Sequence, residues 1–138
     1  TNFIGKSFSK KKSFTDWLAY SIKNNHKIML AKDSYFTPLK VETIAIIIKK
    51  IIKLNKFKSG IYNLGSRKGL SKLEVGKFFI DKLNKQFNNY SVKNINEITK
   101  TRRSKNMMMN VSKFSKTFKI KLPTLTEELK SLIKDYEN

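Results

Sequence analysis

The stretch KIMLAKDSYFTPLKVETIAIIIKKII, residues 27–52, places an apolar strand, a turn and a long amphipathic helix in succession. Asp33–Pro38 predicts the turn, because Asp-Ser favours turns and a proline disfavours helix at the residue before it. From Val41 onward, apolar residues recur at helical spacing and lysines gather near the C-terminal end, where they suit the helix dipole. The residues of this stripe are Val41, Ile44, Ala45, Ile48, Ile51 and Ile52. This helix is the clearest element that the sequence predicts.

Helices are also predicted on both sides of this stretch. Ser13 is an N-cap candidate with an acid three residues later, and helical spacing of apolar residues extends that helix to about Asn25. Ser71–Glu74 is a capping box that opens a helix through about Leu83. Thr124–Glu127 has the same pattern and opens the last helix.

The remaining segments add short strands and one short helix. Residues 1–5 have the character of a strand end, 60–65 form a β-rich run closed by glycines, and 92–98 hold another strand candidate. Residues 110–118 predict a short helix. The order of elements predicts an α/β unit with more helix than strand, and we expect one domain over residues 1–138.

Composition limits the class of protein. The chain has 138 residues and no cysteine, which excludes disulfides and a cysteine nucleophile. No apolar run approaches the roughly 20 residues needed to span a bilayer. We see no signal peptide, and we expect a cytoplasmic protein without membrane contact. The single histidine, His26, lies in a predicted turn without a catalytic pattern around it, and a metal centre is not expected.

The formal net charge of +20 first suggests a nucleic-acid partner. However, only Arg67, Arg102 and Arg103 are arginines, whereas base readout and bidentate phosphate binding favour arginine over lysine. The lysines are scattered through every predicted element. A solvated surface therefore explains the charge better, and a lysine-rich nucleic-acid module stays as the alternative.

The segment TRRSKN, residues 101–106, is the best candidate for a functional site. It sets two arginines in a loop before the apolar run Met107–Met109, which we interpret as core strand packing. Guanidinium groups match phosphate oxygens bidentately, so Arg102 and Arg103 are candidates for phosphate binding. A solvated loop without a ligand is the competing interpretation.

Five segments in order resemble a known family: Thr1–Gly5, Ser13–Phe14, Asp33–Pro38, Gly60–Gly65, and the loop with Arg103 and Asn106 followed by Leu122-Pro123. The third is similar to an Asp-Gln-x-Gly-x-Pro-Thr motif and the fourth to Gly-x-Tyr-His/Asn-Leu. The loop is similar to Arg-Pro-x-Asn, with Ser104 in place of the proline. Together they resemble the C-terminal part of the dTDP-4-dehydrorhamnose reductase family, which belongs to the extended short-chain dehydrogenase/reductases.

The resemblance implies a fold and an activity. It implies the α/β, helix-rich substrate-binding portion of such an enzyme, with a few short strands and without the complete Rossmann sheet. It implies NAD(P)-dependent reduction of a 4-keto sugar on a nucleoside diphosphate, in deoxysugar or polysaccharide precursor biosynthesis. A related sugar-nucleotide epimerase or dehydratase fragment is the alternative within the same class.

The resemblance also implies site residues. Arg103 is expected to contact the substrate diphosphate, and Thr1, Asn2 and Phe3 are expected to border the sugar. Asn106 is expected to brace the arginine loop. No catalytic, cofactor-binding or metal-binding residue is expected in this chain.

Two parts of the family's machinery have no counterpart in the sequence. The five glycines never form Gly-x-x-Gly-x-x-Gly, and no tyrosine has a lysine four residues later. NAD(P)H is therefore expected to bind an N-terminal Rossmann half, in the same or a separate chain, and a homodimer is a further option. We expect the present piece to be inactive alone and to expose apolar surface. Whether it is a truncated or a natural stand-alone product, and which sugar it takes, stay open at this stage.

Overall fold

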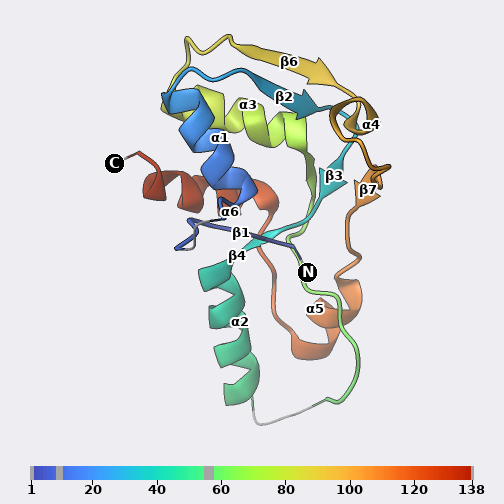
Figure 1. The fold of residues 1–138 in the computed structure, drawn as a ribbon. Helices are drawn as coiled ribbons and strands as arrows, with labels where there is room; N and C mark the ends of the chain where they lie inside the picture. The colour runs from blue at the N-terminus through green and yellow to red at the C-terminus, as the bar shows by residue number, and fades with distance from the viewer. Residues whose placement is uncertain (1, 9–10, 55–57, 138) are drawn as a thin grey trace.

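A computed structural model describes residues 2–8, 11–54 and 58–137 (Figure 1). The helices are α1 (Phe14–Lys23), α2 (Val41–Lys53), α3 (Lys72–Leu83), α4 (Ile95–Ile98), α5 (Ser112–Phe118), α6 (Leu125–Leu132) and the 3-10 helix η1 (Ile133–Asp135). The strands are β1 (Phe3–Ile4), β2 (Ile28–Ala31), β3 (Tyr35–Phe36), β4 (Leu39–Lys40), β5 (Leu70–Ser71), β6 (Tyr90–Lys93) and β7 (Asn106–Met107).

The strands form three small sheets within the described residues. β1 pairs with β4 and β2 with β6, both in parallel. β3 is the centre of the third sheet, where it runs antiparallel to β5 and parallel to β7. This third sheet brings the start of α3 and the loop before β7 to the two sides of one strand.

The larger core lies between the β2–β6 pair and the helices α1, α3 and α6 (Figure 1). α3 approaches β2 closely at Gly76, where a Cβ atom would lie 2.6 Å from the Cδ atoms of Leu30. Leu18, Phe79, Leu125 and Leu129 are fully buried in this core. The predicted N-caps are confirmed, since Ser13, Ser71 and Thr124 each accept a hydrogen bond within a complete capping box.

A smaller core joins α2 to α5 and to Leu122, which follows α5. It buries only part of the apolar stripe predicted for α2. Ile47 is buried in it, although it was outside the predicted stripe, and Ile44 and Ile51 pack at its edge. Val41 and Ile48 remain about half exposed (50% and 49%). The described residues cover only one side of α2, so the other half of the stripe faces outward.

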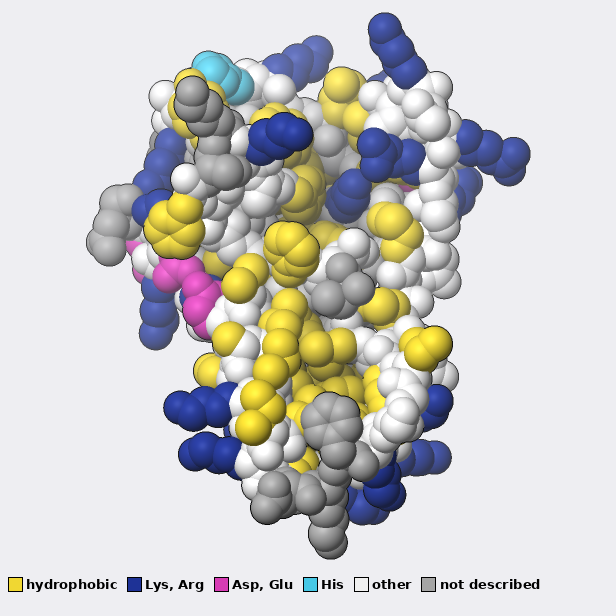
Figure 2. Space-filling view, turned by 60° about the horizontal axis from the view of Figure 1, so that its bottom comes forward, with side chains coloured by type: hydrophobic (Ala, Val, Ile, Leu, Met, Phe, Trp, Pro, Cys, Tyr) yellow, Lys and Arg dark blue, Asp and Glu magenta, His cyan; other side chains and the backbone are white. Residues whose placement is uncertain are grey.

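Apolar side chains are exposed outside α2 as well, as expected. Phe3 and Ile61 are exposed by 68% and 89%. Figure 2 shows a band of hydrophobic side chains running down the lower half of one face, with Lys and Arg side chains along both flanks. None of the helices in the described part of the chain combines the length and apolar character needed to cross a bilayer.

Two predicted strands were wrong in part. Residues 60–65 lie entirely within the described chain and form no strand there. Their neighbours include α5, whose Phe114 and Phe118 rings contact Tyr62, and a helix supplies no strand ladder. In the 92–98 segment, the strand β6 ends at Lys93 and a capping box of Asn94 and Glu97 starts the one-turn helix α4. The predicted helices at 110–118 and after Thr124 are confirmed as α5 and α6.

Candidate functional site

The arginine loop joins α4 to β7 and is held from both ends. The Arg103 N–H donates to Asn96 Oδ1 at 3.0 Å, which ties the loop to α4. At the other end, the Tyr35 N–H donates to the Lys105 carbonyl at 2.8 Å. The side chains of Arg102 and Arg103 are exposed. The backbone of the loop is thus anchored while its guanidinium groups stay accessible to a ligand.

Asp33 adds a side-chain link between the turn before β3 and this loop. Its Oδ1 accepts the Ile95 N–H at 2.7 Å, and its Oδ2 lies 3.1 Å from Lys105 Nζ. The hydrogen bond from Ile95 and the pairing with Lys105 hold the pKa of the Asp33 carboxyl below its ordinary value. The turn-forming Asp-Ser pair that the sequence singled out therefore positions the arginine loop.

An apolar pocket of about 190 Å³ opens beside α4. Its walls come from α1, β2, α3 and α4, and the side chains of Phe14 and Trp17 make its aromatic side. The other lining residues are Met29, Leu30, Ala31, Lys72, Ile95, Ile98 and Thr99. A planar, largely apolar group bound here would lie close to the loop that carries Arg103, since both rest on α4.

Lys72 is the one charged residue among those lining this pocket. Its ammonium lies 5.5 Å from the centroid of the Phe14 ring, and its backbone N–H donates to the Ser34 carbonyl at 2.9 Å. Burial lowers the pKa of Lys72, and the positive charge of Arg103 lowers it further. Sequence reasoning missed Lys72. Its position directly after the Ser71 N-cap was the available signal.

Of the residues predicted to border the sugar, Phe3 lies at a second pocket, of about 270 Å³. Phe3 lines it, and the Asn2 carbonyl accepts the Leu39 N–H at 3.2 Å, while Thr1 lies outside the described residues. The rest of the lining is Gly5, Lys6, Ser7, Lys11, Lys12, Ser13 and Val41. The two pockets share no lining residue, and the adjacent residues Ser13 and Phe14 line one pocket each.

Asn106 shapes the exit from the arginine loop. Its side-chain Oδ1 accepts the Met108 N–H at 3.0 Å, and its carbonyl accepts the Ser104 hydroxyl at 3.0 Å. Met107 continues β7 against β3 and packs on the larger core, while Met108 is exposed by 46%. The methionine run thus alternates between core and surface, in agreement with strand packing at Met107.

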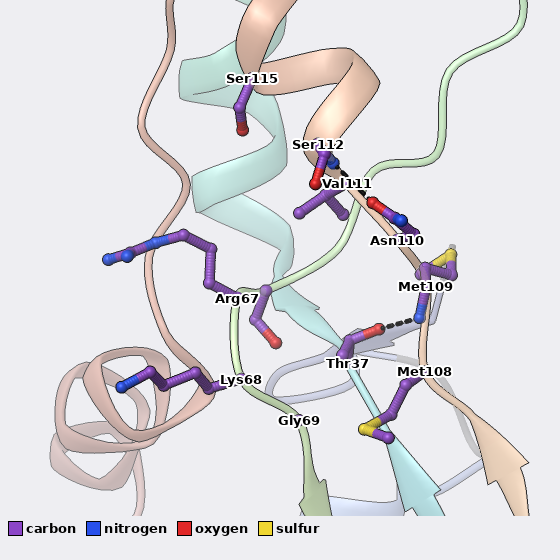
Figure 3. Close-up of a pocket in the computed structure, with 11 residues that line it drawn as sticks. Thr37, Arg67, Lys68, Gly69, Met108, Met109, Asn110, Val111, Ser112 and Ser115 are labelled. Atoms are coloured by element: carbon purple, nitrogen blue, oxygen red, sulfur yellow. Dashed lines mark hydrogen bonds between the residues drawn. The ribbon is translucent and has the colours of Figure 1, made fainter.

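A third and larger pocket, of about 510 Å³, lies between residues 66–69 and 108–115 (Figure 3). The Thr37 hydroxyl accepts the Met109 N–H at 3.1 Å there. Arg67 is turned away from the pocket in Figure 3, with its Nε donating to the Leu122 carbonyl. None of the predicted site residues lines this pocket, and its polar groups mainly hold the segment after β7 in place.

The remaining candidates have structural surroundings. His26 is exposed, and its ring lies edge-to-face with the Tyr20 ring, with 5.4 Å between the two ring centroids. No group of three or more His, Cys, Asp or Glu residues that could hold a metal ion occurs in the described part of the chain. Glu127 and Glu128 occupy the first turn of α6, as the sequence predicted.

Comparison with solved structures defines the class of this fold. The chain superposes on dTDP-4-dehydrorhamnose reductase from Bacillus anthracis in complex with NADP, with a TM-score of 0.80 and 17% identity, over 96% of this chain and 46% of that one. The Yersinia enterocolitica dTDP-4-dehydrorhamnose reductase superposes with a TM-score of 0.79 and 14% identity, over 98% of this chain and 47% of that one. The B. anthracis dTDP-glucose 4,6-dehydratase in complex with NAD superposes with a TM-score of 0.75 and 17% identity, over 99% of this chain and 42% of that one. The fold is that of the substrate-binding portion of an extended short-chain dehydrogenase/reductase.

The sequence itself places the chain in a family. Residues 5–138 match the model of the RmlD substrate binding domain, and the chain belongs to that family. It spans somewhat less than half the length of the solved proteins that it matches. A search of curated protein sequences found no match.

Proposed function

We propose that the chain is the substrate-binding part of an NAD(P)-dependent sugar-nucleotide reductase that resembles dTDP-4-dehydrorhamnose reductase. In this proposal the whole enzyme reduces a 4-keto sugar carried on a nucleoside diphosphate, in the biosynthesis of deoxysugar precursors. The observation that carries the proposal is the position of Arg103, on a loop anchored to the wall of a pocket lined by Phe14 and Trp17.

The chemistry of this pair of features suits a nucleoside diphosphate. The guanidinium of Arg103 would take phosphate oxygens, and the aromatic pocket would take the planar base. Two of the matching structures are named as reductases of a dTDP-linked sugar and one as a dehydratase of a dTDP-linked sugar. A dTDP sugar is therefore the substrate class common to these relatives.

The second pocket supports a place for the sugar. In our proposal Thr1, Asn2 and Phe3 border the sugar, because Phe3 lines a pocket whose Ser13 directly precedes Phe14 of the aromatic pocket. Three lysines line that pocket, and ammonium groups are hydrogen-bond donors suited to hydroxyl and phosphate oxygens. The hydroxyls of Ser7 and Ser13 already donate to the carbonyls of Lys11 and Gly5. Asn106 serves the loop rather than the ligand, through its hydrogen bonds at the end of the arginine segment.

The nicotinamide cofactor and the reacting groups belong, in this proposal, to a nucleotide-binding half in the same or a separate chain. The exposed apolar side of α2, together with Phe3 and Ile61, supplies a surface for that half to cover. The present chain alone is then expected to bind the nucleotide without reducing the sugar. Co-purification with a nucleotide-binding partner, or its coding sequence upstream, would support this arrangement.

The proposal is tested by the affinity of the chain for thymidine diphosphate. Replacing Arg103 with alanine should weaken binding by about 1.5 to 3 kcal/mol, the range for hydrogen bonds to charged groups. Calorimetric titration measures the change. Arg102→Ala is the matched control, because it removes the same charge from the adjacent residue of the same loop. Equal affinities of wild type and Arg103→Ala would show that Arg103 does not bind the diphosphate.

A further inference from the structure

Lys72 differs from the other lysines of the chain in its surroundings. Its side chain is partly buried in the wall of the aromatic pocket, whereas most lysines are exposed. None of the ion pairs formed among the described residues includes it. A partly desolvated ammonium without a carboxylate partner is unfavourable unless something compensates its charge.

The backbone around Lys72 holds this ammonium at the pocket. Ser71, the residue before it, pairs with Tyr35 across β5 and β3, and Ser71 and Glu74 cap α3. On the other side of β3, Tyr35 lies opposite Asn106 of β7, and the Tyr35 N–H donates to the Lys105 carbonyl. The start of α3 and the end of the arginine loop therefore flank the same strand. Neither can move without disturbing the three-stranded sheet.

The charges near Lys72 are mainly positive. The charge of Arg103 acts on it strongly enough to lower its pKa, in addition to the effect of burial. The other residues lining the pocket, from α1, β2 and α4, are uncharged. Of the nearby acids, Asp33 is engaged by Lys105 and the Ile95 N–H, and Glu74 by the capping box of α3. Lys72 and Arg103 are thus two interacting cations, and neither of the nearby described carboxylates, Asp33 and Glu74, is free to neutralise them.

We infer that Lys72 supplies the second cation of the diphosphate site, so that Arg103 and Lys72 bind the phosphates of one ligand together. The inference rests on the proposed function and adds a residue to it. A diphosphate carries enough negative charge to pair with both groups, and it would relieve their mutual repulsion. The competing role for Lys72 is packing alone, with its ammonium over the Phe14 ring.

The inference predicts a particular pH dependence. The protonated ammonium binds the phosphate, so affinity is full while Lys72 is charged and falls as the pH rises through its pKa. Because that pKa is lowered, the fall begins at a lower pH than for an ordinary lysine. Arginine stays protonated over the same range, so Lys72→Arg should keep the affinity and remove the alkaline fall.

The experiment compares thymidine diphosphate, inorganic pyrophosphate and thymidine as ligands of the 138-residue chain, by calorimetry at increasing pH from neutral up to the ordinary lysine pKa of 10.5. We expect Lys72→Ala to weaken the two phosphate ligands about tenfold and to leave thymidine binding unchanged. Lys77→Ala, an exposed lysine of the same helix, is the control for net charge. Melting temperatures of each variant show whether the fold is retained.

Three outcomes would overturn the inference, and they separate it from the proposed function. If Lys72→Ala binds thymidine diphosphate as tightly as wild type while Arg103→Ala does not, the role of Lys72 is wrong and the proposed function stands. If Lys72→Ala loses thymidine as much as the phosphate ligands, the lysine only packs against Phe14. If the wild-type chain binds none of the ligands, the proposed function fails and the inference with it.

Discussion

Glu128 is a buried carboxylate that joins the last helix to the middle of the chain. Its Oε2 accepts the Lys40 N–H at 2.5 Å, and both of its oxygens accept the Thr43 hydroxyl, at 2.9 and 3.0 Å. Lys40 precedes α2 directly, so these bonds fix α6 to the first turn of α2. Removal of the carboxylate would take this acceptor away from the Lys40 N–H and the Thr43 hydroxyl.

Replacing Glu128 with alanine should therefore destabilise the fold by about 1 to 3 kcal/mol, the cost of leaving buried polar groups unsatisfied. Urea unfolding followed by circular dichroism measures the free energy of unfolding. Glu42→Ala is the matched control. Glu42 lies in the first turn of α2, which Glu128 contacts from α6, but the Glu42 side chain is 65% exposed. Unfolding of Glu128→Ala at the wild-type urea midpoint would contradict the prediction.

The candidate site was predictable at this scale only in part. Arg103 could be proposed from the order of residues in its loop, because an arginine pair before an asparagine is a local pattern. Lys72 has no such pattern, and 27 of the 30 basic residues are lysines once the three arginines are subtracted. Its partial burial and its nearness to Arg103 arise from β3, which pairs with two segments distant in sequence.

At the scale of elements, the helix starts were the most predictable features. Ser13, Ser71 and Thr124 each form a capping box with the acid three residues later, and such boxes depend on neighbouring residues alone. The strand expected at residues 60–65 did not form, although its composition is β-rich. A strand needs a partner segment beside it, and the sequence of the strand does not contain that information.

The two sides of α2 give a prediction that belongs to this scale. Ile47→Ala should cost about 2 to 5 kcal/mol, because Ile47 fills the smaller core and its removal leaves a cavity. Ile48→Ala removes the same atoms from the next residue, which is about half exposed, and should change stability by less than about 1 kcal/mol.

Thermal and urea unfolding of both variants test this difference directly. The comparison is matched, because the helix propensity changes by the same amount at both positions. If both variants lost equal stability, the exposed side of α2 would have to be covered in solution, for example by a second copy of the chain.

At the scale of the whole molecule, the first helix and the last residues are joined by one buried network. The Tyr136 hydroxyl donates to Asp16 Oδ1 at 2.8 Å and lies 3.1 Å from the Thr15 hydroxyl. Burial of Asp16 opposes its charged form, but hydrogen bonds from Ser13, Tyr136 and Ser7 outweigh that effect and lower the pKa of the carboxyl. Burial also raises the pKa of Tyr136, so its hydroxyl keeps its proton as a donor.

This network should make stability depend on acid pH. Because the folded-state pKa of Asp16 lies below its ordinary value of 3.8, the carboxylate contributes its full stability above that value. The contribution is lost as the pH falls through the lower, folded-state pKa. Melting temperatures measured from pH 6 to about pH 2, the range over which aspartates titrate, should fall less steeply for Asp16→Asn than for wild type. Parallel melting curves for the two proteins would exclude this role for Asp16.

The sequence alone determined the family, the α/β class, the helix starts and the arginine loop, because each depends on residues that are close together in the chain or in a fixed order. Only the tertiary structure decided which side of α2 is buried, that residues 60–65 lack a strand partner, and that Lys72 lies beside Arg103. These features depend on which distant segments come into contact, and burial and electrostatic interaction act through space rather than along the chain. The two-cation site that we infer for Arg103 and Lys72 depends on β3, which pairs with both β5 and β7.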